Sequence, residues 1–193
     1  MSRILGAILA GGQSRRFGSD KAMALLDDRP LIEHVIAALT PQVAAIVVCG
    51  RAYPGQRCIR DLPALDLGPL GGLNAALALA AAEGFTAVLS VGCDLPGLPP
   101  DLASSLASGA ATYIQSCPIV GLWPASLAPR LAAHLATAAD RSLRAWARAV
   151  RATPVDFTLT NINRPEDLAA YSIEASSLST GHVANVVSES AKA

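Results

Sequence analysis

The chain has 193 residues, of which 52% are hydrophobic, 16% are charged and 4% are aromatic. This length predicts one domain with a full-sized core, and the balance of 15 basic against 15 acidic residues argues against a protein that binds nucleic acid through excess positive charge. A mean hydropathy of +0.40 argues against a disordered chain.

Up to residue 107, apolar runs of strand length alternate with longer stretches that are amphipathic or rich in alanine. The pattern predicts strands over residues 4–9, 44–49 and 87–91, and a brief one over 58–60. It predicts helices over 31–39, 71–83 and 102–107. The first helix begins after Pro30 and the second ends at Gly84. Asp101 is expected to cap the third by accepting hydrogen bonds from its first N–H groups.

Beyond Thr112 the periodicity is weaker, but strands are still predicted over residues 119–123 and 155–157. Helices are predicted over 126–138, 142–150 and 165–171. Residues 172–193 are rich in Ser and Ala and are expected to form a flexible tail. The alternation predicts an α/β fold in which one domain, residues 1–171, contains a mostly parallel, doubly wound sheet flanked by helices. Ligands of such folds bind at the carboxyl ends of the strands.

The cysteines and histidines indicate a cytoplasmic protein without a His-based site. No C-x-x-C pair occurs, so reduced thiols are favoured over disulfides at Cys49, Cys58, Cys93 and Cys117. The histidines are too scattered for a metal site or a Ser-His-Asp triad: His34, His134 and His182. The longest charge-free run, residues 102–129, is broken by Ser, Gly and Pro, so no membrane span is predicted.

The loop after the first strand has the chemistry of a phosphate site. Gly11 and Gly12 follow the strand directly and allow the backbone to approach a ligand, and Arg15, Arg16 and Lys21 add positive charge. This combination suits a triphosphate that must lose pyrophosphate. The spacing matches neither the P-loop nor the dinucleotide-binding fingerprint. The alternative is a flexible surface loop with solvated charges.

Two further carboxylate segments follow predicted strands. Asp94 comes just after the strand over 87–91, where it is well placed to bind Mg²⁺, although it could instead cap a turn before Pro96. Asp61 and Asp66 precede a Gly-Pro turn into a helix. A carboxylate there can accept both the N1–H and N2–H₂ groups of guanine, while the alternative is a role in helix capping.

These segments together resemble the molybdenum cofactor guanylyltransferases, a family of nucleotidyltransferases with a Rossmann-like sheet. The resemblance extends over residues 4–171 and rests on five motifs in the same order. They are Leu9-Ala10-Gly11-Gly12 with Ser14, Arg16, Phe17, Gly18, Asp20 and Lys21; Arg29-Pro30-Leu31; Gly68-Pro69-Leu70-Gly71-Gly72-Leu73; Cys93-Asp94-Leu95-Pro96; and Asn161-Ile162-Asn163 with Pro165, Glu166, Asp167 and Leu168.

The family transfers GMP from Mg-GTP to the phosphate of molybdopterin or its molybdenum-loaded form and releases pyrophosphate. The resemblance therefore implies GTP and molybdenum cofactor as substrates and Mg²⁺ as cofactor. It implies the following roles: nucleotide contact by Leu9, Ala10, Gly11 and Gly12; phosphate binding by Arg16 and Lys21; guanine binding by Asp61; Mg²⁺ binding by Asp94; and pterin contact by Asn161 and Asn163. It also implies protein partners, a molybdenum-loading protein upstream and an apo-molybdoenzyme or its chaperone downstream.

The chain departs from the family pattern at two positions. Cys49 stands where the family often has Asn, so one nucleotide contact is either missing or made by the backbone. Arg164 stands where Thr is usual and could add a cation near the pterin phosphate.

The expected reaction is an in-line attack of the acceptor phosphate on the α-phosphorus of GTP, with no protein nucleophile. One alternative is a related nucleotidyltransferase that uses CTP with the same cofactor, or a nucleotide with a sugar phosphate. Another is a nucleotide-binding regulator without turnover. The turn over residues 68–72 with Asp61 favours GTP, Asn161 and Asn163 favour the pterin, and the presence of both Lys21 and Asp94 favours an enzyme.

Overall fold

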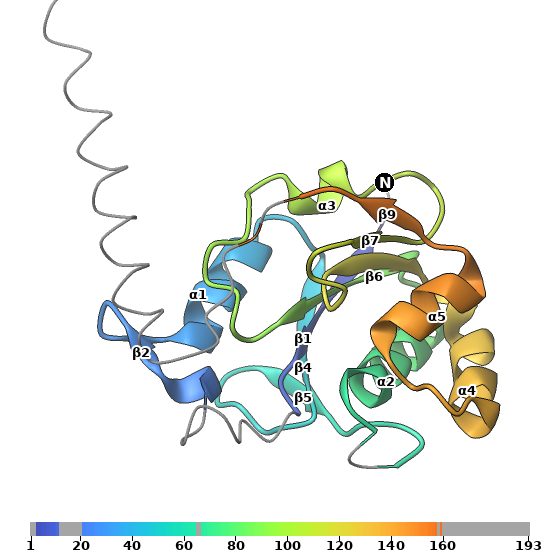
Figure 1. Ribbon diagram of the computed structural model, residues 1–193. Coiled ribbons are helices and arrows are strands. Elements are labelled where there is room, and N and C mark those ends of the chain that lie inside the picture. The colour runs from blue at the N-terminus through green and yellow to red at the C-terminus, as the bar shows by residue number, and fades with distance from the viewer. Residues whose placement is uncertain (1–2, 12–20, 65–66, 158, 160–193) are drawn as a thin grey trace, which may run out of the picture.

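A seven-stranded sheet lies at the centre of the computed structural model, which describes residues 3–11, 21–64, 67–157 and 159 (Figure 1). Its strands in spatial order are β5 (Arg57–Ile59), β4 (Ala45–Cys49), β1 (Ile4–Leu9), β6 (Ala87–Gly92), β8 (Gly121–Pro124), β7 (Thr112–Ile114) and β9 (Thr153–Val155). Only β8 runs antiparallel to its neighbours. The predicted mostly parallel α/β sheet is therefore confirmed.

Helices cover both faces of this sheet (Figure 1). Two lie on one face, α1 (Leu31–Leu39) and α3 (Leu102–Ser105), and three on the other, α2 (Pro69–Ala82), α4 (Ala128–Thr137) and α5 (Leu143–Val150). The short elements are the 3-10 turns η1 (Lys21–Met23) and η2 (Ala125–Leu127) and the hairpin strands β2 (Leu25–Leu26) and β3 (Arg29–Pro30). No helix in the described part of the chain is long and apolar enough to cross a membrane.

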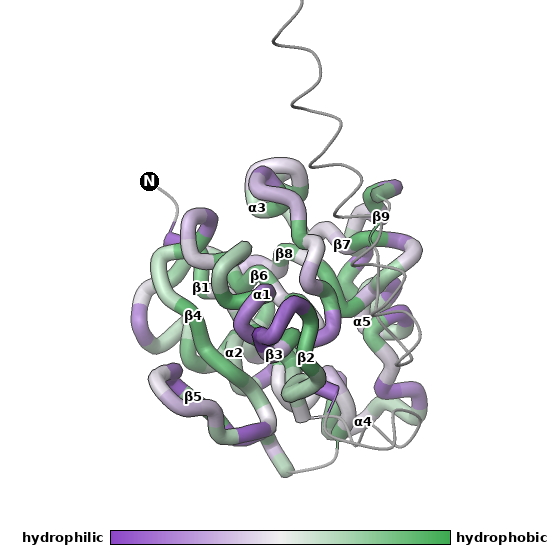
Figure 2. The backbone as a smooth tube through the Cα atoms, turned by 90° about the vertical axis from the view of Figure 1, so that its left-hand side faces the viewer, coloured by the Kyte–Doolittle hydropathy of each residue, from purple (hydrophilic) through white to green (hydrophobic). Residues whose placement is uncertain are grey.

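The buried side chains alternate between two hydrophobic clusters, one on each face of the sheet. Along β1, Leu5, Ala7 and Leu9 face the cluster under α2, whereas Ile8 faces the cluster under α1. Because both faces are covered, the inner strands are apolar along nearly their whole length. Figure 2 shows this pattern, with β4 coloured hydrophobic and β5, at the edge of the sheet, hydrophilic.

Several predicted boundaries require correction. Helix α2 begins at Pro69, two residues before the predicted start, because Pro is favoured in the first helical turn. Strand β8 begins at Gly121 instead of residue 119, and β9 at Thr153 instead of residue 155. Helix α3 ends at Ser105, and Asp101 does not cap it, because its carboxylate accepts a hydrogen bond from the Ser105 hydroxyl instead.

Three short strands were not predicted from the sequence. Strand β7 has three residues, and β2 and β3 have two each, which is too short for a readable alternation. The β2–β3 hairpin turns at Asp27 and Asp28, whose φ angles of 49° and 59° are positive. Asp tolerates this conformation better than most residues. The helix predicted over 165–171 and the tail over 172–193 lie outside the described residues.

A hydrogen-bonded network joins β6 to β8 inside the core. Ser90 on β6 accepts a hydrogen bond from the Trp123 indole N–H at 2.9 Å and donates one to the Ile119 carbonyl at 2.8 Å. Ser90 and Trp123 are both fully buried. Because a buried N–H without a partner is costly, this hydroxyl stabilises the junction from which β6 continues to Asp94.

Substitution of Ser90 should therefore destabilise the fold. We expect Ser90→Ala to lower the free energy of unfolding by about 2 kcal/mol, because it leaves the Trp123 N–H buried without an acceptor. Urea denaturation followed by tryptophan fluorescence measures the loss. The matched control is Ser108→Ala, at an exposed position, which should change it by less than about 0.5 kcal/mol. Equal stability of the two variants would contradict the role given to Ser90.

Candidate active site

The carboxyl ends of the parallel strands bring the predicted site segments to one edge of the sheet. Strand β1 lies between β4 and β6, so the residues after Leu9 lie between those that follow Cys49 and Gly92. The ladder continues past the strands, because the Ala10 N–H donates to the Cys49 carbonyl and the Gly50 N–H to the Ile59 carbonyl, both at 3.0 Å. Asp61 and Asp94 consequently follow strands that end at the same edge.

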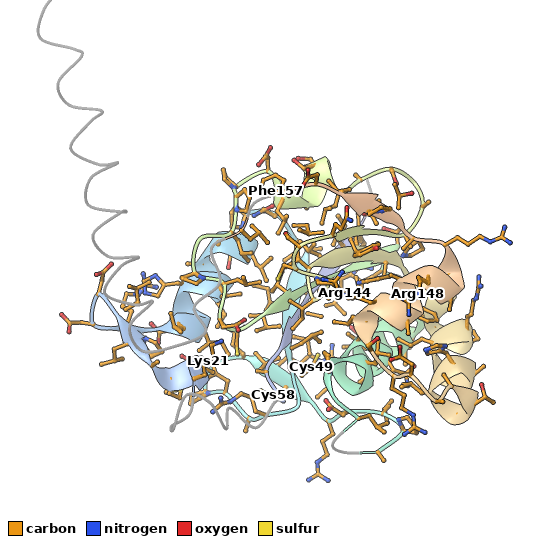
Figure 3. All side chains as sticks on the ribbon, viewed as in Figure 1. Lys21, Cys49, Cys58, Arg144, Arg148 and Phe157 are labelled. Carbon is orange, nitrogen blue, oxygen red and sulfur yellow. The ribbon has the colours of Figure 1, made fainter. Side chains whose placement is uncertain are left out.

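At this edge Lys21 and Asp94 form an ion pair across 73 residues of sequence. The Lys21 Nζ lies 2.6 Å from Asp94 Oδ2, and the two side chains are 13% and 19% exposed. Partial burial strengthens the attraction relative to a surface pair, and each charge offsets the cost of removing the other from water. The structure thus brings together two residues that the sequence assigns to phosphates and to a metal. Figure 3 shows Lys21 beside the sheet, below α1.

Room for the Asp94 carboxylate depends on Gly92, the last residue of β6. A β-carbon on Gly92 would collide with Asp94 Oδ1, so the carboxylate folds back over a residue that has no side chain. Gly92 therefore helps to set the direction in which Asp94 points. The sequence shows this glycine, but not its contact with the carboxylate two residues later.

Asp61 lies in a narrow space between backbone segments, and only 9% of it is exposed. Within 3.4 Å of its side chain are the positions that β-carbons would take on the glycines around it: Gly11, Gly50, Gly71 and Gly72. We call these residues the glycine cage. They come from the ends of β1 and β4 and from the first turn of α2, so three separate elements converge on one carboxylate.

The tightest approach in the glycine cage is between Gly50 and Gly11. Gly50 has a φ angle of +82°, and a β-carbon on it would lie 2.5 Å from the Gly11 Cα and 3.1 Å from Asp61 Oδ1. Real β-carbons do not approach backbone atoms this closely, and a side chain is also strained at this φ. Both the conformation and the contact thus require glycine at position 50.

Helix α2 holds the segment that carries Asp61. The Leu62 N–H donates to the Gly71 carbonyl at 3.1 Å, and the buried Asn74 side chain donates to the Leu62 carbonyl at 3.2 Å. Asn74 thereby fixes the backbone next to Asp61. It is a positioning residue that we did not identify from the sequence, although an Asn within an alanine-rich helical stretch was a visible signal.

The thiols near the site are protonated at neutral pH. Cys49 is 1% exposed, and its pKa is raised first by burial and then by the negative charge of Asp61. Burial, followed by Asp94, also raises the pKa of Cys93 to about 12, although Lys21 and Arg51 partly oppose this. Neither group is a thiolate nucleophile at pH 7. Cys49, Cys58, Cys93 and Cys117 are all free in the structure.

On the other side of β6 from Asp61, the chain leaves the sheet beside the β7–β8 turn. The Gln115 N–H donates to the Val155 carbonyl and the Ser116 hydroxyl to the Phe157 carbonyl, both at 3.0 Å. These bonds hold the segment up to Phe157 against the β7–β8 turn. The following residues of the predicted site segments lie outside the described residues, and their roles stay predictions: Gly12, Arg15, Arg16, Asp66, Asn161, Asn163 and Arg164.

Within the described part of the chain, no three His, Cys, Asp or Glu side chains are grouped so that they could hold a metal ion by themselves. Asp94 is thus a single carboxylate with a cation beside it. That arrangement suits Mg²⁺, which usually takes one or two carboxylates and completes its coordination with water and substrate phosphates. A mostly parallel sheet with glycines, a lysine and a carboxylate at its carboxyl edge is typical of α/β enzymes that act on nucleotides.

Comparison with known proteins agrees with that class. A family model for the MobA-like NTP transferase domain matches residues 6–155. A molybdenum cofactor guanylyltransferase from Rhodobacter capsulatus is 40% identical over 181 residues, which cover 86% of this chain and 94% of the relative. A second, from Rhizobium leguminosarum, is 36% identical over 195 residues, covering 87% and 91%. The chain therefore belongs to the MobA-like NTP transferases and, among them, to the molybdenum cofactor guanylyltransferase family.

A solved structure shows the same fold. Molybdopterin-guanine dinucleotide biosynthesis protein A from Archaeoglobus fulgidus superposes with a TM-score of 0.71, over 90% of this chain and 99% of that protein, at 21% sequence identity. The sequence-based assignments of family and fold are thus confirmed.

The glycine cage predicts a large difference between two similar substitutions. We expect Gly50→Ala to lower the free energy of unfolding by about 3 kcal/mol, from backbone strain and the collision with Gly11. Gly55 also has a positive φ, +72°, but nothing lies within 4 Å of its β-carbon position. Gly55→Ala should thus cost only the strain, about 1 kcal/mol. Chemical denaturation of both variants measures the difference, and equal losses would refute the close contact.

Proposed function

We propose that this protein transfers GMP from GTP to the terminal phosphate of molybdopterin or the molybdenum cofactor, forming the guanine dinucleotide and releasing pyrophosphate. The observation that carries this proposal is the Lys21–Asp94 ion pair at the carboxyl edge of the sheet. An ammonium group suits phosphate oxygens and a carboxylate suits a divalent metal, so this pair supports the proposal. The relatives named above support the choice of substrates.

The chemistry of the described residues fits a Mg²⁺ ion bound with the nucleotide. Asp94 would hold it, and Mg²⁺ would reduce the negative charge on the phosphates. The Asp94 carboxylate is partly exposed, so it is accessible to an incoming Mg-nucleotide, and the ion pair with Lys21 holds its position until then. Gly92 leaves the space in which that carboxylate lies.

The reaction needs positioning and charge stabilisation rather than a protein nucleophile. An oxygen of the acceptor phosphate attacks the α-phosphorus of GTP, the new phosphoanhydride bond forms, and the bond to the pyrophosphate leaving group breaks. The acceptor phosphate is already largely ionised at neutral pH, so no base is required to activate it. Lys21, together with Arg16, which lies five residues earlier in the sequence, stabilises the charge that moves to the departing pyrophosphate.

Asp61 supplies guanine selectivity in this proposal. A carboxylate accepts hydrogen bonds from both N1–H and N2–H₂ of guanine, and adenine lacks this pair of donors. The glycine cage shields Asp61 from water, so a base without these two donors forms fewer hydrogen bonds to a carboxylate that water reaches poorly. That cost is what makes hydrogen-bonded pockets selective.

The decisive experiment incubates the protein with GTP, Mg²⁺ and molybdopterin and follows pyrophosphate release. We expect release with GTP that depends on molybdopterin, and at least about 10-fold less with CTP or ATP. A preference for CTP would show that CTP, and not GTP, is the nucleotide donor. Binding of GTP without pyrophosphate would support a regulator instead.

Asp94→Asn tests the central residue in the same assay. It keeps the size of the side chain but removes the charge, and we expect turnover to fall by about 100-fold or more at saturating Mg²⁺. Asp101→Asn is the matched control, because Asp101 is an exposed carboxylate later in the same loop and should leave turnover within about two-fold of wild type. Unchanged turnover in Asp94→Asn would overturn the assignment.

Asp61→Asn tests base reading separately from chemistry. An amide cannot accept both guanine donors, so we expect the ratio of kcat/KM for GTP over ATP to fall by at least about 10-fold. The rate with saturating GTP should fall much less than in Asp94→Asn. A selectivity ratio equal to that of wild type would show that Asp61 does not read the base.

A further inference from the structure

Helix α5 begins at the carboxyl edge of the sheet, where Asp94 lies. The helix leads through Arg151 directly into β9, and β9 is parallel to β7 and therefore to β1 and β6. Through the ladder, Thr153 at the start of β9 is level with Leu89 of β6, so α5 ends toward the amino-terminal half of the sheet. Its first turn, with Arg144, consequently lies at the opposite edge, and Arg148 lies one turn farther from it.

Arg144 is an exposed cation without an internal partner. Throughout the described residues, no hydrogen bond or ion pair to its guanidinium is formed. Two neighbouring arginines differ from it in this respect, since Arg148 pairs with Asp140 at 3.7 Å and Arg130 donates to the Ala149 carbonyl. Buried Trp146 anchors α5 to the core, so the base of Arg144 is held on a fixed helix.

Arg144 is also directed toward the site. Figure 3 shows it on the side of α5 nearer the middle of the sheet, with Arg148 farther out along the helix. The β7–β8 turn contains Cys117, whose pKa is raised by burial and by Asp94 and is lowered by the charges of Arg144 and Lys21. Cys117 is therefore close enough to Arg144, Lys21 and Asp94 for all three charges to affect its pKa.

The strand order places Arg144 on the side of the site away from the guanine pocket. Asp61 follows β5, at one end of the sheet, whereas the β7–β8 turn lies beyond β6. In-line transfer at a phosphorus atom requires the attacking oxygen to approach opposite the leaving group. If the nucleotide lies between Asp61 and Lys21, the acceptor comes from the side of the β7–β8 turn and α5.

We propose that Arg144 binds the phosphate of the acceptor substrate and holds it for attack. This inference rests on the proposed GMP transfer and names a residue for the second substrate. A guanidinium binds a phosphate through two parallel hydrogen bonds and remains charged at any pH of interest. Its position on a helix fixed by Trp146 lets it orient the acceptor rather than only attract it.

The test compares Arg144→Gln with Arg148→Gln in the pyrophosphate assay. Both changes remove one exposed arginine charge from the same helix face, but only Arg144 lies at the carboxyl edge. We expect Arg144→Gln to raise KM for molybdopterin by about 10- to 100-fold and to change KM for GTP by less than about two-fold. Arg148→Gln should change either value by less than about two-fold, and Arg144→Lys should recover part of the loss.

Equal KM values for molybdopterin in the two glutamine variants would overturn the inference. A general loss of structure would instead raise both KM values and lower the unfolding temperature, which thermal denaturation detects. Direct titration with molybdopterin, without GTP, separates the two proposals. In one outcome the wild-type protein binds molybdopterin, Arg144→Gln binds it at least about 10-fold more weakly, and neither protein transfers GMP. The proposed function would then fail, while the role of Arg144 in binding the acceptor would stand.

Discussion

The ion pair between Lys21 and Asp94 connects the two halves of the site. It joins the segment after β1 to the segment after β6. Because the pair is partly buried, removal of either charge leaves the other partly withdrawn from water without this ion pair, which is unfavourable. The pair works because the two strands are adjacent and parallel, which brings their carboxyl ends together. Everything proposed for catalysis depends on this juxtaposition, since a metal-binding carboxylate and a phosphate-binding ammonium are useful only a few ångströms apart.

Around this pair, the site depends on glycines, which have no side chain, as much as on the side chains that it contains. The glycine cage leaves space for Asp61, and Gly92 leaves space for Asp94. In both cases the backbone approaches a carboxylate that a β-carbon would displace. Asn74 of α2 adds a side-chain contact, because it donates to the Leu62 carbonyl and fixes the backbone next to Asp61.

Much of the fold could be predicted from the sequence because its elements have clear boundaries. Pro30 and Gly84 mark the ends of helices, and β1, β4 and β6 are apolar runs long enough to recognise. The short strands were missed because two or three residues show no periodicity. For the site, the residue types after each strand led us to name Lys21 and Asp94, which the structure brings together, while their roles in phosphate and metal binding stay predictions. Their direct contact, the burial of Asp61 and the placement of Arg144 depend on packing between distant segments, which no local pattern contains.

The glycine cage has a consequence for changing the nucleotide preference of this enzyme. A longer acid at position 61 would need space for one more methylene, and the atoms around it belong to rigid backbone rather than to side chains that can rotate away. With Asp61 in its proposed role, a single replacement is enough to lose guanine selectivity, but redirecting that selectivity toward another base requires coordinated movement of β1, β4 and α2. On this proposal, the base specificity of the pocket depends on the relative positions of the secondary structure elements themselves.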